Sequence, residues 1–283
     1  MVFENLGLIF TEDFARNAFI IGILISACTA ILGVEIVLKK YSMLGDGLSH
    51  VSFGTLAVAS AFNFASMEVS LCIVILVAFL LLQIRQNSKI NGDAAVAVVS
   101  GSFMAIGIFA SSLSGGSSTE FSSYMFGSIF AINDSFWFSV VMCSVVILVF
   151  CLFYNKIFAV TFDEDFSKAT GGKTGFYNLI IAVLTAVTVV VGMKLIGTLL
   201  ISSLTVFPVV ASLRLAKNYR SSVVLAVIFS LTAFVFGFAL SLCIENMPLS
   251  SAVIFCNLFV LACSFIVSIL RKRRRISVER SCK

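Results

Sequence analysis

Two residues that can bind a metal ion stand four positions apart in an otherwise apolar stretch, "YSMLGDGLSHVSFGTLAVAS", residues 41–60. They are Asp46 and His50, and His50 is the only histidine among the 283 residues. Residues four apart in an α-helix lie on the same face, so the carboxylate and the imidazole can point toward one target. Such oxygen and nitrogen donors suit divalent first-row metals such as zinc, manganese and iron.

The same pair has a plainer interpretation, because a hydrogen bond between Asp46 and His50 would also hold helices together. Spacing alone leaves both interpretations open. Two ligands from one helix make at most half of a metal site, which suits a protein that must release its ion. Glu35 lies deep in the preceding apolar run and either joins this site or pairs elsewhere. Acids at such depth are costly and usually functional.

The elements that must position these residues are membrane helices. The chain is 60% hydrophobic and 12% charged, with a mean hydropathy of +1.11, whereas a soluble domain is about 25% charged. Its repeated apolar runs have the length of membrane spans. We therefore predict an all-α, polytopic helical membrane protein with about nine (eight to nine) transmembrane helices in one domain, residues 1–283. The runs lie near 17–38, 43–63, 69–84, 94–112, 135–154, 177–193, 196–213, 222–243 and 250–270.

Basic residues predict the orientation of these spans. If the loop with Lys39 and Lys40 is cytoplasmic, all of the 19 lysines and arginines except Arg16 and Lys194 fall on the cytoplasmic side. The positive-inside rule then places the N-terminus outside and the C-terminus inside. The tail, residues 271–283, contains "RKRRR". Directly after a span, it is predicted to be a cytoplasmic anchor rather than a nucleic-acid-binding segment.

One cytoplasmic loop contains "FDEDFSKATG", residues 162–171. Its pattern predicts a short helix that ends at a glycine and carries exposed aromatic residues, which suits docking into a groove of a partner protein. An interfacial helix without a partner is the alternative. The overlapping "SKATGGKTG", residues 167–175, resembles a phosphate-binding loop, but Ser167 replaces its first glycine and no αβ unit surrounds it. If ATP is used, another chain must hydrolyse it.

Two entries into outward-going helices are similar, "KKYSMLGDGLSHVSFG" and "RQNSKINGDAAVAVVSG". Both lead from a basic loop through Gly-Asp into an apolar run, as in the internal repeats of transporters. The aspartate of the second, Asp93, is either a first-turn acid that interacts with the helix dipole or a functional carboxylate.

Six segments in this order resemble the permease subunits of the bacterial metal-uptake ABC transporters, and together they cover nearly the whole chain. The most specific is "LKKYSMLGDGLSH", which is similar to the signature of that family. The others are "GDAAVAVV" at 92–99, "YMFGSIFAIND" at 124–134, "FDEDFSKATG" at 162–171, "IGTLLISSLTVFPVVAS" at 196–212 and "ENMPLSSAVIF" at 245–255.

The resemblance implies a multi-pass protein of the bacterial inner membrane, surrounded by lipid and without a nucleic-acid partner. It implies a second copy of the chain, two cytoplasmic ATPases that use ATP, and an extracellular metal-binding protein. The chain itself would be a transport subunit rather than an enzyme and would hold no permanent cofactor. Its cargo would be zinc, manganese or iron.

By this resemblance, Asp46 and His50 are transient ligands on the path of the ion, with Glu35 as a further candidate. Segment 162–171 would be the coupling helix that contacts the ATPase, through Phe162, Asp163, Phe166 and Gly171. The chain departs from the family pattern at Glu35, usually apolar, at Thr55, often glycine, and at Tyr41, often methionine. The departure at Glu35 puts selectivity or gating in question.

Two other functions remain compatible with the carboxylates. In a stand-alone, proton-coupled secondary transporter, Asp46, Asp93 and Glu35 would relay protons. In an intramembrane aspartic enzyme, Asp46 and Asp93 would share a proton at close range. Neither function accounts for the helix at 162–171, and residue types do not identify the metal.

Overall fold

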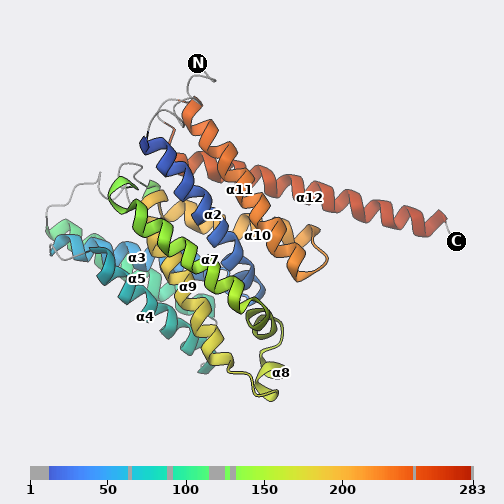
Figure 1. Cartoon of the computed structure of the whole chain (residues 1–283), viewed down its shortest axis with the longest axis horizontal. Helices are drawn as coiled ribbons and strands as arrows, with labels where there is room; N and C mark the ends of the chain where they lie inside the picture. Colours follow the sequence, from blue (N-terminus) through green and yellow to red (C-terminus); the bar gives the residue numbers. More distant parts are fainter. Residues whose placement is uncertain are drawn as a thin grey trace.

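The computed structural model describes residues 13–62, 66–87, 92–114, 125–127, 132–244 and 247–281. Within these residues the chain forms ten helices and no strand (Figure 1). The helices are α2 (Asp13–Leu38), α3 (Leu44–Ala61), α4 (Ser66–Asn87), α5 (Gly92–Leu113), α7 (Ile132–Phe162), α8 (Glu164–Ala169), α9 (Thr174–Ile196), α10 (Thr198–Leu215), α11 (Tyr219–Cys243) and α12 (Leu249–Ser281).

The nine long helices follow the nine predicted apolar runs, so the all-helical membrane fold is confirmed. Seven of the described helices are long and apolar enough to cross a membrane, namely α2, α5, α7, α9, α10, α11 and α12. Helix α4 contributes a shorter apolar stretch, Glu68–Leu81. Helix α3 is less apolar because it contains Asp46, His50 and several glycines and serines, but most of its residues are buried against other helices.

Two helices continue well past the apolar runs that predict them. Helix α7 extends to Phe162 instead of ending near 154, and α12 extends to Ser281 instead of ending near 270. A hydropathy pattern marks where a helix leaves the lipid, whereas lysine and arginine are good helix formers that let it continue into water. The predicted basic tail is therefore helical as far as Ser281. Figure 1 shows this end of α12 projecting away from the bundle.

Helices α2 and α9 form the centre of the bundle. Of the residues in the most apolar segment of each helix, 67% are buried in α2 and 78% in α9, against 11% in α5 and 17% in α12. Figure 1 shows α3, α4 and α5 on one side of this centre and α11 and α12 on the other. The helices that carry Asp46, His50 and Asp93 are therefore grouped together, away from α11 and α12.

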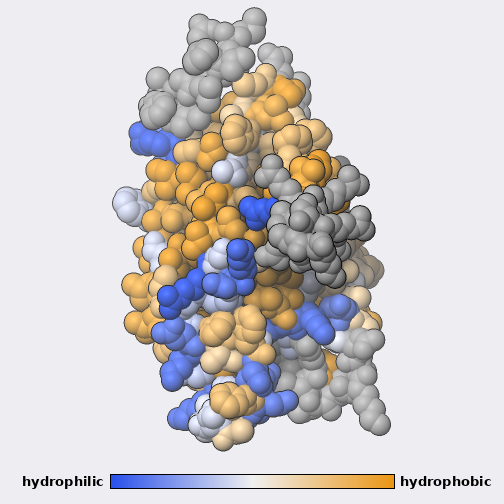
Figure 2. Space-filling model, turned by 90° about the vertical axis from the view of Figure 1, so that its right-hand side faces the viewer, coloured by the Kyte–Doolittle hydropathy of each residue, from blue (hydrophilic) through white to orange (hydrophobic). Residues whose placement is uncertain are grey.

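Four helix ends meet at the end of the bundle where α8 lies. Glu35, in the last turn of α2, accepts hydrogen bonds from Thr161 near the end of α7 and from Tyr219 at the start of α11. Lys39, just after α2, donates to Asn178 in the first turns of α9. Figure 2 shows hydrophilic residues gathered at this lower end, below a broad hydrophobic zone. The predicted topology assigns all four helix ends to the cytoplasm.

Candidate metal site

Helices α3 and α5 line an open cavity of about 280 Å³ that contains three of the residues singled out from the sequence. Asp46 and His50 line it from α3, and Asp93 lines it from the first turn of α5. Ser100 and Met104 continue the α5 wall and add a hydroxyl and a thioether. Two Gly-Asp segments far apart in the sequence therefore contribute their aspartates to one cavity.

The two residues of α3 point toward each other as their spacing predicts. The Nε2 atom of His50 lies 3.7 Å from the Oδ2 atom of Asp46. This separation is too long for a good hydrogen bond. It is close to the ~3.4 Å expected between two atoms that bind one zinc ion at ~2.1 Å with tetrahedral angles. The geometry thus fits two ligands of one ion better than a direct bond between the side chains.

The site is open rather than enclosed. Relative exposure is 45% for the side chain of Asp46 and 25% for that of His50, so an ion here remains accessible from outside the single chain. Among the described residues, no three His, Cys, Asp or Glu side chains are close enough together to hold a metal ion. Asp93 shares the cavity without completing such a group. One chain therefore brings a carboxylate, an imidazole and a second carboxylate to the same cavity.

Close packing between α3 and α5 sets the width of the cavity. A Cβ atom on Gly47 would lie 2.1 Å from a methyl carbon of Val96, and one on Gly54 would lie 2.1 Å from the carbonyl oxygen of Phe103. Contacts this short require glycine, and small residues commonly bring membrane helices together in this way. Because both contacts advance in the same direction along the two helices, α3 and α5 run parallel. Both aspartates consequently lie at the same end.

Glu35 lies elsewhere in the molecule. Its side chain is completely buried and its oxygens accept hydrogen bonds from the hydroxyls of Thr161 and Tyr219. It does not line the cavity that contains Asp46 and His50. The structure therefore brings together Asp46, His50 and Asp93, but not Glu35. The hydroxyl partners of Glu35 could not be identified from spacing, because they are 126 and 184 residues away in the chain.

Segment 162–171 contains helix α8, which is held by its own end groups. Asp163 is the N-cap, and its side chain accepts a 2.8 Å hydrogen bond from the backbone N–H of Phe166. At the other end, Gly171 has a φ of 81°, and the N–H of Gly172 donates to the carbonyl of Ser167 at 2.8 Å. This pattern is a Schellman motif, in which glycine takes the left-handed conformation at low cost. Both ends of the short helix are therefore specified locally.

The surface of α8 is partly aromatic and partly charged. Phe166 on α8 and Phe162, which is the last residue of α7 rather than part of the short helix, are 66% and 61% exposed. Lys168 bonds to Glu164 at 2.9 Å, and this hydrogen bond to a carboxylate raises the pKa of Lys168. Asn178 donates to Glu164 at 3.3 Å and also accepts from Lys39. Helix α8 is thereby connected through α9 to the turn that precedes α3.

A cluster of hydroxyls between α3 and α4 was not expected from the sequence. Thr55 lies 2.7 Å from Ser70, oxygen to oxygen, and Ser52 lies 3.5 Å from Ser70. All three are buried. Thr55 is one of the departures from the family pattern, and its hydroxyl joins the two helices where a glycine could not. This bond joins α3 to α4 through a different face of α3 from the one that packs against α5.

Comparison with known proteins supports the assignment suggested by these segments. The sequence model of a family described as "ABC 3 transport family" matches residues 11–268 of this chain. The high-affinity zinc uptake system membrane protein ZnuB of Buchnera aphidicola is 28% identical over 241 residues, which are 84% of this chain and 92% of that protein. The manganese import system permease protein ScaB of Streptococcus gordonii is 26% identical over 256 residues, 90% and 91% of the two chains.

A solved structure agrees with these sequence matches. A chain of the structure described as PsaBC from Streptococcus pneumoniae in complex with Fab is similar, with a TM-score of 0.83 and 26% identity. The similarity covers 94% of this chain and 95% of that one. The family match spans most of the sequence and reaches into every helix described above. The resemblance drawn from the six segments is therefore confirmed, and the chain belongs to the ABC 3 transport family.

Proposed function

We propose that this chain is the membrane-spanning permease subunit of an ATP-driven importer that carries divalent transition-metal ions into the bacterial cytoplasm. The observation that carries the proposal is the pair Asp46 and His50, 3.7 Å apart in a cavity beside Asp93. One carboxylate oxygen and one imidazole nitrogen suit zinc, manganese and iron. Relatives described as zinc and manganese uptake permeases support this class of cargo.

The two-ligand site suits transfer better than storage. An ion held by four protein ligands leaves slowly, whereas one held by two ligands and water can be passed on. A second copy of the chain would supply a matching pair, and the openness of the cavity supports such an arrangement. Asp46 and His50 would catch the ion from an extracellular metal-binding protein and release it inward.

Glu35 has a different role in this proposal. Its carboxylate oxygens already accept hydrogen bonds from Thr161 and Tyr219, so a ligand role would require both bonds to break. It instead ties the end of α7, just before α8, to α2 and α11. This is a positioning role at the place where a partner would act on the membrane helices.

We infer that α8 is the contact with a separate ATPase chain. The exposed Phe162 and Phe166 offer an apolar surface, while Asp163 and Gly171 hold the helix that presents it. Movement of α8 would reach α3 through Asn178 and Lys39. Binding energies are reciprocal in such coupling, so the metal-loaded donor must also promote closure of the ATPases.

The proposal is tested by uptake of radiolabelled zinc and manganese into cells that carry Asp46→Ala or His50→Ala. We expect both variants to lose at least nine tenths of uptake at normal membrane abundance. Glu68→Gln is the matched control, because Glu68 is an exposed carboxylate at the first turn of α4 and outside the cavity. Normal uptake by both cavity variants would remove these residues from the ion path. Uptake by the purified chain in liposomes without an ATPase would contradict the proposed energy source.

A further inference from the structure

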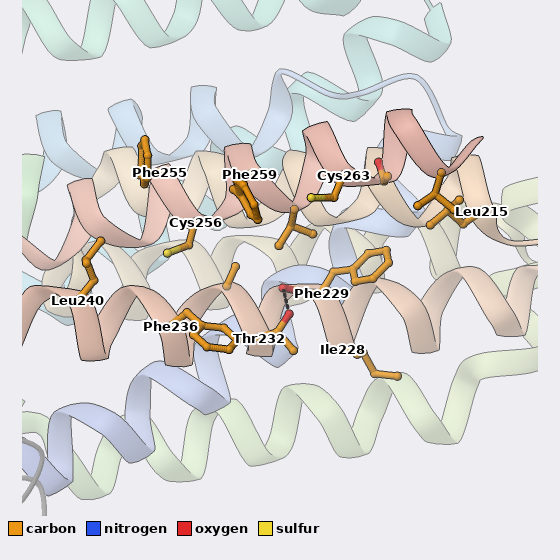
Figure 3. Close-up of a pocket in the computed structure, with 14 residues that line it drawn as sticks. Leu215, Ile228, Phe229, Thr232, Phe236, Leu240, Phe255, Cys256, Phe259 and Cys263 are labelled. Carbon is orange, nitrogen blue, oxygen red and sulfur yellow. Dashed lines mark hydrogen bonds between the residues drawn. The ribbon is translucent and has the colours of Figure 1, made fainter. Parts of the chain in front are cut away.

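A groove of about 620 Å³ runs between α11 and α12 on the side of the bundle remote from the metal cavity (Figure 3). Its floor includes Ala233, which is completely buried, and its rim includes three phenylalanines that are 61–69% exposed, Phe236, Phe255 and Phe259. Figure 3 shows side chains of both helices directed into the space between them. The wall is apolar throughout, apart from the hydroxyls of Thr232 and Ser264.

The groove lies within the part of the protein that faces lipid. Both Tyr219–Cys243 and Leu249–Arg271 are long and apolar enough to cross a membrane. From Ile228 to Leu240 the groove follows α11 over twelve residue-to-residue steps, about 18 Å at 1.5 Å per step. One leaflet of a hydrocarbon core is about 15 Å thick. The groove therefore has the length of one leaflet, which is the space occupied by a lipid acyl chain.

Basic residues stand at one end of the groove. Leu215 lines this end, and its carbonyl oxygen accepts a hydrogen bond from Nη1 of Arg271 at 3.5 Å. The guanidinium carbon of Arg214 lies 3.3 Å from the centre of the Phe265 ring. Both arginines are exposed at the predicted cytoplasmic end, and the sequence continues with Lys272, Arg273, Arg274 and Arg275. A guanidinium stacked on a ring can still donate from its edge to a phosphate.

This charge distinguishes between possible occupants of the groove. A second copy packed across it with twofold symmetry would bring the same surface of both chains together, including both sets of arginines. The like charges would oppose that contact. A lipid with an anionic headgroup instead neutralises them, as basic pockets between membrane helices do at cytoplasmic surfaces. We propose that the groove binds an acyl chain of an anionic phospholipid whose phosphate is held by Arg214 and Arg271.

The test uses the purified, delipidated full chain with phosphatidylglycerol and phosphatidylcholine of identical acyl chains, each titrated and counted by native mass spectrometry. We expect phosphatidylglycerol to bind more tightly. Arg214→Gln and Arg271→Gln are each expected to weaken phosphatidylglycerol binding about 5-fold, because each removes about one charge contact with the headgroup. The double variant should weaken it about 25-fold. Lys156→Gln is the matched control, since Lys156 is exposed on α7 at the same end of the bundle. It should leave binding unchanged.

A second arm tests the groove itself. Trp137 is the only tryptophan, so a chain with Trp137→Phe and Phe259→Trp reports from the groove rim. Its fluorescence should be quenched more by brominated phosphatidylglycerol than by the brominated phosphatidylcholine, and the arginine double variant should abolish the difference. Equal quenching, or unchanged phosphatidylglycerol binding by the double variant, would overturn the proposal. The variant Cys263→Trp fills the groove and gives a further test. If it converts a dimer to a monomer while phosphatidylglycerol still binds, the groove is an interface between chains and the proposal is overturned.

Discussion

The hydroxyl of Tyr219, the first residue of α11, donates a hydrogen bond to the carboxylate of Glu35 in the last turn of α2. Thr161 donates to the other oxygen of the same carboxylate. Because Thr161 lies three residues before α8, the carboxylate joins three membrane helices at the base of the proposed contact with the ATPase. A buried acid of this kind has all its partners within the protein, as a carboxylate surrounded by lipid requires.

Removal of one hydroxyl should loosen this junction measurably. Tyr219→Phe is expected to lower the free energy of unfolding by about 0.6–2 kcal/mol, the range of hydrogen bonds between membrane helices. Thermal unfolding of the purified chain in detergent measures the effect. Tyr177→Phe is the control, since Tyr177 lies at the same end in α9 and packs against Phe153 and Phe176. If the effects of Tyr219→Phe and Glu35→Gln simply add, the two residues are not coupled.

Asp93 should affect metal uptake less than Asp46 does. It lines the cavity but belongs to no group of three ligands, so its contribution is the negative potential near the ion rather than a direct bond. We expect Asp93→Asn to reduce uptake about 3- to 10-fold, equivalent to roughly 1 kcal/mol. The measurement is initial uptake rate against zinc concentration. A loss as complete as that of Asp46→Ala would make Asp93 a full ligand.

The glycine contact between α3 and α5 should not tolerate even a methyl group. A Cβ atom on Gly54 would lie 2.1 Å from the carbonyl oxygen of Phe103. Because this oxygen belongs to the backbone of a helix, it cannot move aside as a flexible side chain could. Gly54→Ala should therefore separate the two walls of the cavity, destabilise the chain by about 1–3 kcal/mol and reduce uptake. Thermal unfolding and uptake would both be measured. Gly101→Ala on α5 is the control, because no atom lies within 4 Å of its Cβ position. Equal behaviour of the two variants would refute the packing argument.

The ends of α8 should matter for coupling rather than for ion binding. Asp163→Ala removes the N-cap and should destabilise the helix by about 1 kcal/mol. Gly171→Ala forces a side chain into a left-handed conformation at a similar cost of about 1 kcal/mol. Both should lower metal-stimulated ATP hydrolysis of the assembled transporter while leaving the membrane abundance of the chain unchanged.

Gly175→Ala is the matched control for Gly171→Ala. The Cβ position of Gly175 also has no atom within 4 Å, but its backbone is helical. It should therefore leave ATP hydrolysis unchanged. Coupling that survives in both α8 variants would mean that the ATPase contacts another part of the chain.

Much of the architecture could be predicted from the sequence, because lipid imposes a simple rule. A segment that crosses a membrane must satisfy its backbone internally and present apolar side chains, so each apolar run corresponds to a helix. The same regularity placed Asp46 and His50 on one helix face. Local signals also predicted a short helix within 162–171, since Asp163 and Gly171 act within a few residues of their partners. The helix itself is shorter, Glu164–Ala169, because Phe162 ends α7 and Asp163 is the N-cap.

The tertiary structure decided which of the acidic residues lie together. Asp46 and Asp93 line one cavity because glycines let α3 and α5 approach closely. Glu35, equally conspicuous in the sequence, is turned toward Thr161 and Tyr219. Spacing along one helix fixes which side chains share a face, but it carries no information on which helix that face meets. That choice depends on packing between segments from about 50 to 184 residues apart, so only the folded arrangement separates the cavity of Asp46 and His50 from the hydrogen-bonded junction at Glu35.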